Sequence, residues 1–261
     1  LWTALIYLYL HSLRDYSSPL KMLVSETMER LKQAKRRQES DDASPERDDP
    51  AGNKVLRKVF FFLACTFEGQ PFPLPGYGSE KQPLYSIPQL LNAIFEPPER
   101  REGQISSAAP VLFQRAMHFS PPAFFNVLAR LFSSSFAQKA VQRAGDAGQR
   151  IGDPPEEMSL QWISTLSQKA FQSCRKAVEE GNAPAALPPL PEDIEDHYLV
   201  FLATASTHAK LKLDAEILPS ISRCLLRRGD IEKSEPLLLE LIKLYQSPWM
   251  LGEKIRVLRR Y

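Results

Sequence analysis

Apolar side chains in this chain recur every three or four residues, and the pattern is clearest in residues 105–136. Two apolar stripes there are separated by Ser120 and Pro121, a pair typical of a helix N-cap followed by a proline at the first helical position. The stripes consist of Leu112, Phe113, Ala116, Met117 and Phe119, followed by Phe124, Phe125, Leu128, Leu131 and Phe132. Asn126 and Arg130 fall on the opposite side of the second helix, which we expect to face solvent. The stretch therefore predicts two helices that meet at a corner, and each stripe needs neighbouring helices to bury it.

The same spacing predicts helices on both sides of this pair. They are expected at about 1–13, 17–37, 54–67 and 87–95, and then at about 153–181, 192–205, 214–228, 236–245 and 249–261. The helix beginning at 153 is expected to open with a capping aspartate, two prolines and two glutamates, which suit the positive end of the helix dipole. Alternation of apolar and polar residues is nowhere long enough to predict a strand. We therefore predict an all-α fold, an α-solenoid-like stack of antiparallel helix pairs that forms a single segment over residues 1–261.

Three stretches without helical periodicity are predicted to be flexible loops, at about 36–53, 69–86 and 145–154. The first lacks aromatic and β-branched residues and carries charges of both signs, which is typical of disorder. Within it, Ser44 precedes a proline, so the site is either a phosphorylation site or, as we favour, part of a plain solvated linker. The third is rich in glycine, but no predicted strand precedes it and no GK[ST] motif follows, so a phosphate-binding loop is not predicted.

Composition indicates an ordinary globular protein with reduced cysteines. Of the 261 residues, 43% are hydrophobic and 25% charged, and the formal net charge of +2 does not favour nucleic-acid binding. Cys65, Cys174 and Cys224 are scattered over predicted helices without a CxxC spacing, which predicts free thiols in a cytosolic protein. Residues 1–10 resemble no signal peptide and are too short to span a bilayer, so no transmembrane segment is predicted. Because the chain begins inside an apolar helix without an initiator methionine, we expect it to be part of a longer protein.

Candidate chemistry is weak, and we predict no enzyme, no cofactor and no catalytic or metal site. No hydrolase, zinc-protease or nucleotide-binding motif occurs, and the histidines lack a metal-ligand spacing. These histidines, each on a different predicted helix, are His11, His118, His197 and His208. Two charged clusters have structural explanations, because acids at 192–196 suit the start of a helix and basic residues at 32–37 suit a solvated helix end. The residues that bind a partner are left unidentified by the sequence.

Three blocks of sequence nevertheless resemble one family. The first combines an aliphatic, tyrosine-containing helix with a Leu-x-Asp-Tyr-x-x-Pro-Leu pattern, carried by Leu13, Asp15, Tyr16, Pro19 and Leu20. The second places a glycine before a Phe-Pro-Leu turn, carried by Gly69, Phe72, Pro73 and Leu74. The third lies on the central helix pair, carried by His118, Phe119, Phe125, Asn126, Val127, Leu128 and Ala129. In content and order these blocks resemble the central helical region of the vacuolar protein sorting-associated protein 8 family, from which residues 35–53 and 145–155 depart.

This resemblance implies a non-enzymatic scaffold. Members of that family are subunits of CORVET, a membrane tether on endosomes, so the resemblance implies a cytoplasmic protein bound peripherally to the endosome membrane. It also implies binding to the other tether subunits, above all to their shared class C core, in support of vesicle fusion and vacuolar protein sorting. Rab-GTPase binding is assigned in the family to an N-terminal β-propeller region, which is not among these residues. The alternative function is a helical-repeat RNA-binding module, which a basic concave surface would favour and the near-neutral charge does not.

Overall fold

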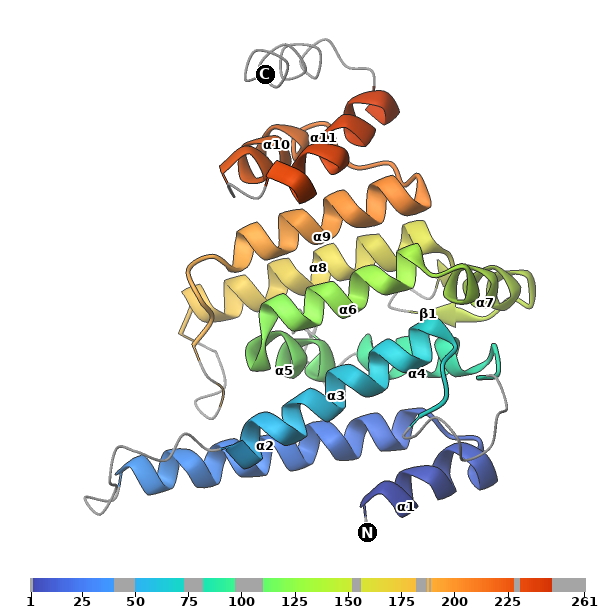
Figure 1. Ribbon diagram of the computed structural model, residues 1–261, viewed down its shortest axis with the longest axis vertical. Coiled ribbons are helices and arrows are strands. Elements are labelled where there is room, and N and C mark those ends of the chain that lie inside the picture. Colours follow the sequence, from blue (N-terminus) through green and yellow to red (C-terminus); the bar gives the residue numbers. More distant parts are fainter. Residues whose placement is uncertain are drawn as a thin grey trace, which may run out of the picture.

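The computed structural model describes residues 2–39, 50–72, 82–96, 110–151, 156–181, 187, 189–227 and 231–245. Within them, helices are stacked along the long axis of the molecule, from α1 and α2 at one end to α10 and α11 at the other (Figure 1). The first elements are α1 (Trp2–Tyr7), the π-helix η1 (Leu8–Leu13), α2 (Ser17–Glu39), α3 (Pro50–Glu68), α4 (Ser86–Ile94), α5 (Val111–Phe119) and α6 (Pro121–Ser133). They are followed by α7 (Ser135–Asp146), β1 (Arg150–Ile151), β2 (Glu156–Glu157), α8 (Leu160–Glu179), α9 (Ile194–Ala209), α10 (Leu218–Arg227) and α11 (Ile231–Tyr245).

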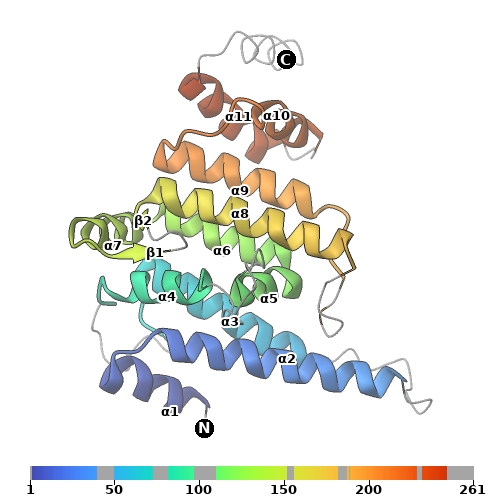
Figure 2. The ribbon, with the colours of Figure 1, turned by 180° about the vertical axis from the view of Figure 1, so that it is seen from behind.

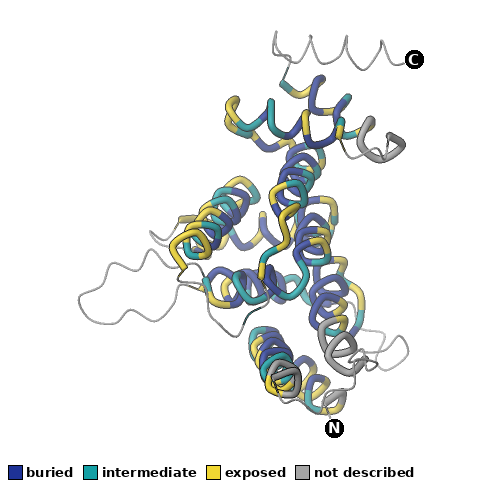
Figure 3. Tube along the Cα trace, turned by 90° about the vertical axis from the view of Figure 1, so that its left-hand side faces the viewer, coloured by how far each residue is buried: buried dark blue, intermediate teal, exposed yellow. Residues whose placement is uncertain are grey.

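The central helices lie in two layers. In one layer α3, α6 and α9 lie side by side, with α6 between the other two (Figure 1). The second layer contains α4, α5 and α8, which face the viewer in Figure 2. Helix α2 packs against α3 at one end of the stack, and α10 and α11 pack against α9 at the other. Buried residues run between these layers along most of the stack (Figure 3), and the predicted all-α stack is confirmed.

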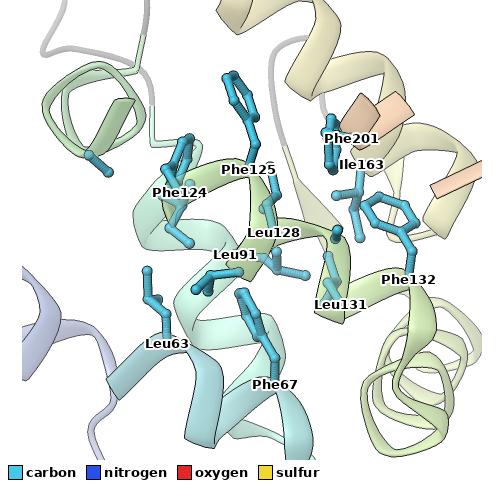
Figure 4. Packing of buried hydrophobic residues seen from close by; sticks show 14 of the residues in the cluster. Leu63, Phe67, Leu91, Phe124, Phe125, Leu128, Leu131, Phe132, Ile163 and Phe201 are labelled. Carbon is cyan, nitrogen blue, oxygen red and sulfur yellow. The ribbon is translucent and has the colours of Figure 1, made fainter. Parts of the chain in front are cut away.

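Helix α6 holds the centre of the core because neighbours cover it on two sides. Leu128 and Leu131 are buried on the side nearer Phe67 of α3 and Leu91 of α4 (Figure 4). Asn126 lies on the exposed side of the helix, as the apolar stripe predicted. The predicted corner before α6 is also confirmed, since Ser120 has an extended backbone and Pro121 begins the helix. Ser120 occupies the N-cap position without a capping hydrogen bond from its side chain to the described residues.

Aromatic rings join α6 to α8 and α9. The centroid of the Phe125 ring lies 5.7 Å from that of Phe201 and 5.6 Å from that of Tyr198. Tyr198 in turn stacks on Phe171 of α8, with the ring centroids 4.0 Å apart and the planes 15° apart. Such pairs contribute about 0.5–1.5 kcal/mol each beyond the burial of their area. The cluster therefore holds α9 against α6 in its own layer and against α8 in the other layer.

The first helical corner is fixed by Asp15. Its Oδ1 accepts hydrogen bonds from the backbone nitrogens of Ser17 (2.9 Å) and Ser18 (3.1 Å), and α2 begins at Ser17 as predicted. Burial acts to raise the pKa of this carboxyl, but the hydrogen bonds from Ser18 and Ser17 outweigh it and lower the pKa below its usual value. Gln89 of α4 reaches the same corner and accepts a hydrogen bond of 2.9 Å from the backbone nitrogen of Tyr16. Asp15 and Tyr16 of the first resembling block are therefore structural residues.

The glycine of the second resembling block also has a structural cause. Gly69 ends α3 with a φ of +71°, a conformation that residues with a side chain rarely adopt. A Cβ atom there would lie 2.8 Å from the ring of Phe136 in α7, so the close approach of α3 and α7 requires glycine. Phe72, three residues later, is buried and packs edge-on against Phe62 at 5.1 Å between centroids. Leu74 lies outside the described residues.

Helical residues extend into the stretches that the sequence assigned to loops. Helix α2 continues to Glu39 and α3 begins at Pro50, inside the stretch 36–53. In the second half of α2, Lys32 Nζ lies 2.7 Å from Glu29 Oε1 one turn earlier, a spacing that favours the helix. Helix α4 begins at Ser86, whereas residues 73–81 and Ser44 lie outside the described residues. The flexibility of the three stretches stays a prediction.

A short β-hairpin begins inside the stretch 145–154, where the sequence predicted no strand. Arg150 pairs with Glu157 and Ile151 with Glu156, in antiparallel orientation. Two-residue strands are too short to show an alternating pattern, which explains why the sequence did not predict them. The expectation that 153–157 opens a helix is wrong, because α8 begins at Leu160.

A buried hydroxyl network attaches α11 to the loop after α9. The hydroxyl of Tyr245 accepts a hydrogen bond from the backbone nitrogen of Leu213 (2.7 Å) and donates one to the carbonyl of Leu211 (2.8 Å). Ser206 of α9, which is fully buried, places its Oγ 3.0 Å from the same hydroxyl. The buried hydroxyl of Tyr198, in contrast, has no hydrogen-bond partner among the described residues. The hydroxyl of Tyr245 is therefore satisfied by hydrogen bonds, whereas the hydroxyl of Tyr198 is buried without one among the described residues.

Replacing each tyrosine by phenylalanine should separate these two situations. Tyr245→Phe should lower the free energy of unfolding by about 1–3 kcal/mol, because it leaves a buried backbone N–H without its acceptor. Tyr198→Phe should leave the free energy of unfolding unchanged or raise it by up to about 1 kcal/mol, because it removes a hydroxyl that is buried without a partner. Urea denaturation followed by far-ultraviolet circular dichroism measures both. The reverse order of the two variants would contradict this assignment.

Candidate partner-binding groove

An open groove lies between α7 and the N-terminal half of α8, beside the β-hairpin. Figure 2 shows these elements together at one side of the stack. The groove has a volume of about 1190 Å³. Its lining includes Gln142 and Asp146 of α7, Arg150 and Glu157 of the hairpin, and Trp162 of α8. We refer to it below as the α7–α8 groove.

The groove depends on a close approach between α7 and the segment before α8. A Cβ atom on Gly145 would lie 2.5 Å from the carbonyl oxygen of Met158, so only glycine permits this contact. The backbone nitrogen of Met158 donates a hydrogen bond of 2.9 Å to the carbonyl of Gln149. Ser159 then caps α8, its Oγ accepting a hydrogen bond of 3.1 Å from the backbone nitrogen of Trp162. These contacts fix the two walls relative to each other.

Trp162 is held in a defined position by contacts on two sides. Its Nε1 donates a hydrogen bond of 2.7 Å to the carbonyl of Ile151 in β1. The ammonium of Lys169, two turns further along α8, lies 4.9 Å from the centroid of the indole ring, which is cation–π geometry. Beside it, the amide of Gln161 exchanges two hydrogen bonds of 3.1 Å with the backbone of Lys212 after α9. Hydrogen bonds thereby connect the α8 wall of the groove to the hairpin and to the segment that follows α9.

Charged side chains in the groove lie without ion-pair partners. Asp146, Glu156 and Glu157 contribute three carboxylates, and Arg150 contributes one guanidinium. All four residues are exposed, and none of them forms an ion pair with any residue that the structure describes. The groove therefore has an excess of negative charge.

The histidines do not converge on a common site. His118 is buried in α5, His11 lies against the ring of Tyr7 with 4.2 Å between centroids, and His208 is exposed on α9. His197 Nε2 lies 3.1 Å from Asp193 Oδ2, one helical turn earlier. Within the described part of the chain, no three potential metal ligands cluster together.

The acidic residues at 192–196 connect helices. Glu195 and Asp196 lie in the first turn of α9, as the helix-dipole interpretation predicted. Glu195 Oε2 accepts a hydrogen bond of 3.1 Å from Arg175 of α8, and Asp196 Oδ1 accepts one of 3.0 Å from Arg227 of α10. These exposed pairs contribute at most about 1 kcal/mol each, and they orient α9 between its neighbours.

The three cysteines are buried and form no disulfide, as the sequence predicted for reduced thiols. Burial raises the pKa of Cys174 to about 12. The pKa of Cys65 is also raised, by burial first and by the nearby carboxylate of Glu68 second. Because the reactive form of cysteine is the thiolate, these environments do not favour nucleophilic chemistry.

The groove was not predicted from the sequence. Gln142 and Gln161 carry no pattern that distinguishes them from ordinary solvent-facing residues, and Trp162 lies beside the apolar stripe of α8. The one available signal was the pair Glu156–Glu157, which we had placed in a helix. The two prolines in residues 153–155 favoured that assignment, because proline is common in the first turn of a helix. The hairpin becomes evident only when α7 and α8 are placed together.

Comparison with known protein families identifies a match to the first half of the chain. The sequence model of the family described as "Vps8 central TPR" matches residues 1–132. Comparison with curated proteins and with solved structures gave no significant match. Among the helices in the described residues, none combines the length and apolar character that crossing a bilayer requires.

The matched region ends inside α6, whose face is buried against α9, so it should not fold well alone. A fragment of residues 1–132 should self-associate and should melt at a lower temperature, and over a broader range, than the full chain, because the Phe125 face is left exposed. Sedimentation velocity and differential scanning calorimetry measure the two properties. Phe125→Ser in the fragment should reduce its self-association, and a monomeric fragment that melts as sharply as the full chain would refute the expectation.

Proposed function

The chain belongs to the Vps8 central TPR family, and from this premise we propose that it is a non-enzymatic scaffold segment of a CORVET-like membrane-tethering complex on endosomes. In this role it supports vesicle fusion with endosomes and vacuolar protein sorting. The single observation that carries the proposal is the family match over residues 1–132. The stacked architecture supports it independently.

A stacked helical fold suits the role of a spacer. In such a fold each helix contacts its neighbours in the stack, so length is gained without a larger core and side surfaces stay available to other proteins. Here α2, α3, α6, α9 and α10 follow one another along the long axis (Figure 1). Among the described residues, no three potential metal ligands cluster together, and the three cysteines are buried.

The partners we propose are the other subunits of the tether, above all their shared class C core. The protein would then act in the cytoplasm as a peripheral component of the endosome membrane, held there by its complex. We assign Rab-GTPase recognition to the family's N-terminal β-propeller region and not to residues 1–261. RNA binding, the alternative function, has no observation in its favour, since the net charge is +2 and the groove carries excess carboxylates.

Binding of the full 261-residue chain to purified tether subunits tests the proposal. The immobilised chain should retain the class C core subunits at physiological salt and should not retain single-stranded RNA. A chain carrying Leu128→Asp, which places a charge in the core, is the control that should lose this binding together with its fold. If the folded chain retains no tether subunit and binds single-stranded RNA, the RNA-binding function should replace the scaffold role.

A further inference from the structure

We propose that the α7–α8 groove is a docking site for an extended, basic segment of a partner protein. The inference rests on the proposed function only in treating the chain as a scaffold that binds proteins. It adds a location and a chemical class of ligand, and it can be tested without any tether subunit.

The size and openness of the groove favour a polypeptide segment. Small-molecule sites are typically about 300–1,000 Å³ and enclose most of their ligand. The α7–α8 groove is open to solvent and has a volume of about 1190 Å³. A segment of chain lying between α7 and α8 would fill such a space while remaining part of a larger protein.

The walls of the groove are already ordered before any ligand binds. The hydrogen bonds of Trp162 to Ile151 and of Gln161 to Lys212 hold α8, and the contact of Gly145 with Met158 holds α7. A preformed site avoids much of the entropic cost of ordering side chains upon binding. Exposed Gln142 adds an amide that can exchange hydrogen bonds with an extended backbone.

The charge of the groove selects a basic occupant. Asp146, Glu156 and Glu157 present carboxylates without ion-pair partners among the described residues, against the single cation of Arg150. Lysine or arginine side chains of a partner would pair with the carboxylates and raise the rate of association.

Trp162 indicates how a cation would be accommodated. The chain's own Lys169 already lies over the indole ring at 4.9 Å, so a cation of the partner would stack on the ring in place of this ammonium. Arginine stacks on aromatic rings more readily than lysine does. We therefore expect arginine-containing segments to bind more tightly than lysine-containing ones.

A labelled peptide of alternating arginine and serine residues is the probe. Fluorescence anisotropy should show saturable binding to the full chain, and a peptide with glutamate in place of arginine should not bind. The triple variant Asp146→Asn, Glu156→Gln, Glu157→Gln should weaken binding about tenfold or more, since each exposed pair contributes modestly. The matched control removes three exposed acids elsewhere, by Glu192→Gln, Asp214→Asn and Glu216→Gln, and should bind as the unmodified chain does.

Nuclear magnetic resonance locates the bound peptide. The indole Nε1–H signal of Trp162, assigned with Trp162→Phe, should shift upon titration in the unmodified chain and in the control variant. The inference is overturned if the arginine peptide does not bind, if both triple variants bind it equally, or if binding leaves the Trp162 signal unmoved. None of these outcomes bears on the tether-binding experiment, and failure of that experiment leaves the peptide result standing.

Discussion

The burial of α6 by neighbouring helices on two sides is the constraint on which the rest of the structure depends. Its Leu128 and Leu131 pack toward α3 and α4, whereas Phe125 and Phe132 pack toward the aromatic residues of α8 and α9. Fully burying each of these side chains contributes about 1.5–3 kcal/mol, so we expect each half of the stack to be less stable with the other half absent. The residues that match the family model end within this helix, and residues after it belong to the same core.

Helices with strong apolar periodicity were predictable, because burial of one face is a local property of the sequence. The corner at Ser120, the exposure of Asn126 and the helix dipole interpretation of Glu195 all follow from the spacing of neighbouring residues. Features that depend on a distant partner were not predictable in the same way. The hairpin at Arg150 exists because α7 and α8 approach each other at Gly145, and no local pattern reports that approach.

Core and surface residues have different roles in this structure. Hydroxyl and carboxamide groups that are buried or half-buried, such as Ser206 and Gln89, form hydrogen bonds with the backbone at the corners and so hold neighbouring elements together. Charged residues connect successive helices at the surface, or, in the α7–α8 groove, remain available to a partner. The rigid interior determines where those surface groups are held, and this arrangement is what a scaffold offers to the proteins that bind it.

The central claim, that α6 couples the two halves into one folded unit, is tested most directly by hydrogen exchange of the Phe125→Ala variant. Removing this ring should cost about 3–5 kcal/mol. If α6 couples the halves, amides of α3 and of α9 should both lose protection, whereas Asn126→Ala should leave both as in the unmodified chain. Loss of protection in α9 alone, with α3 unchanged, would contradict the claim and would show two independently stable halves.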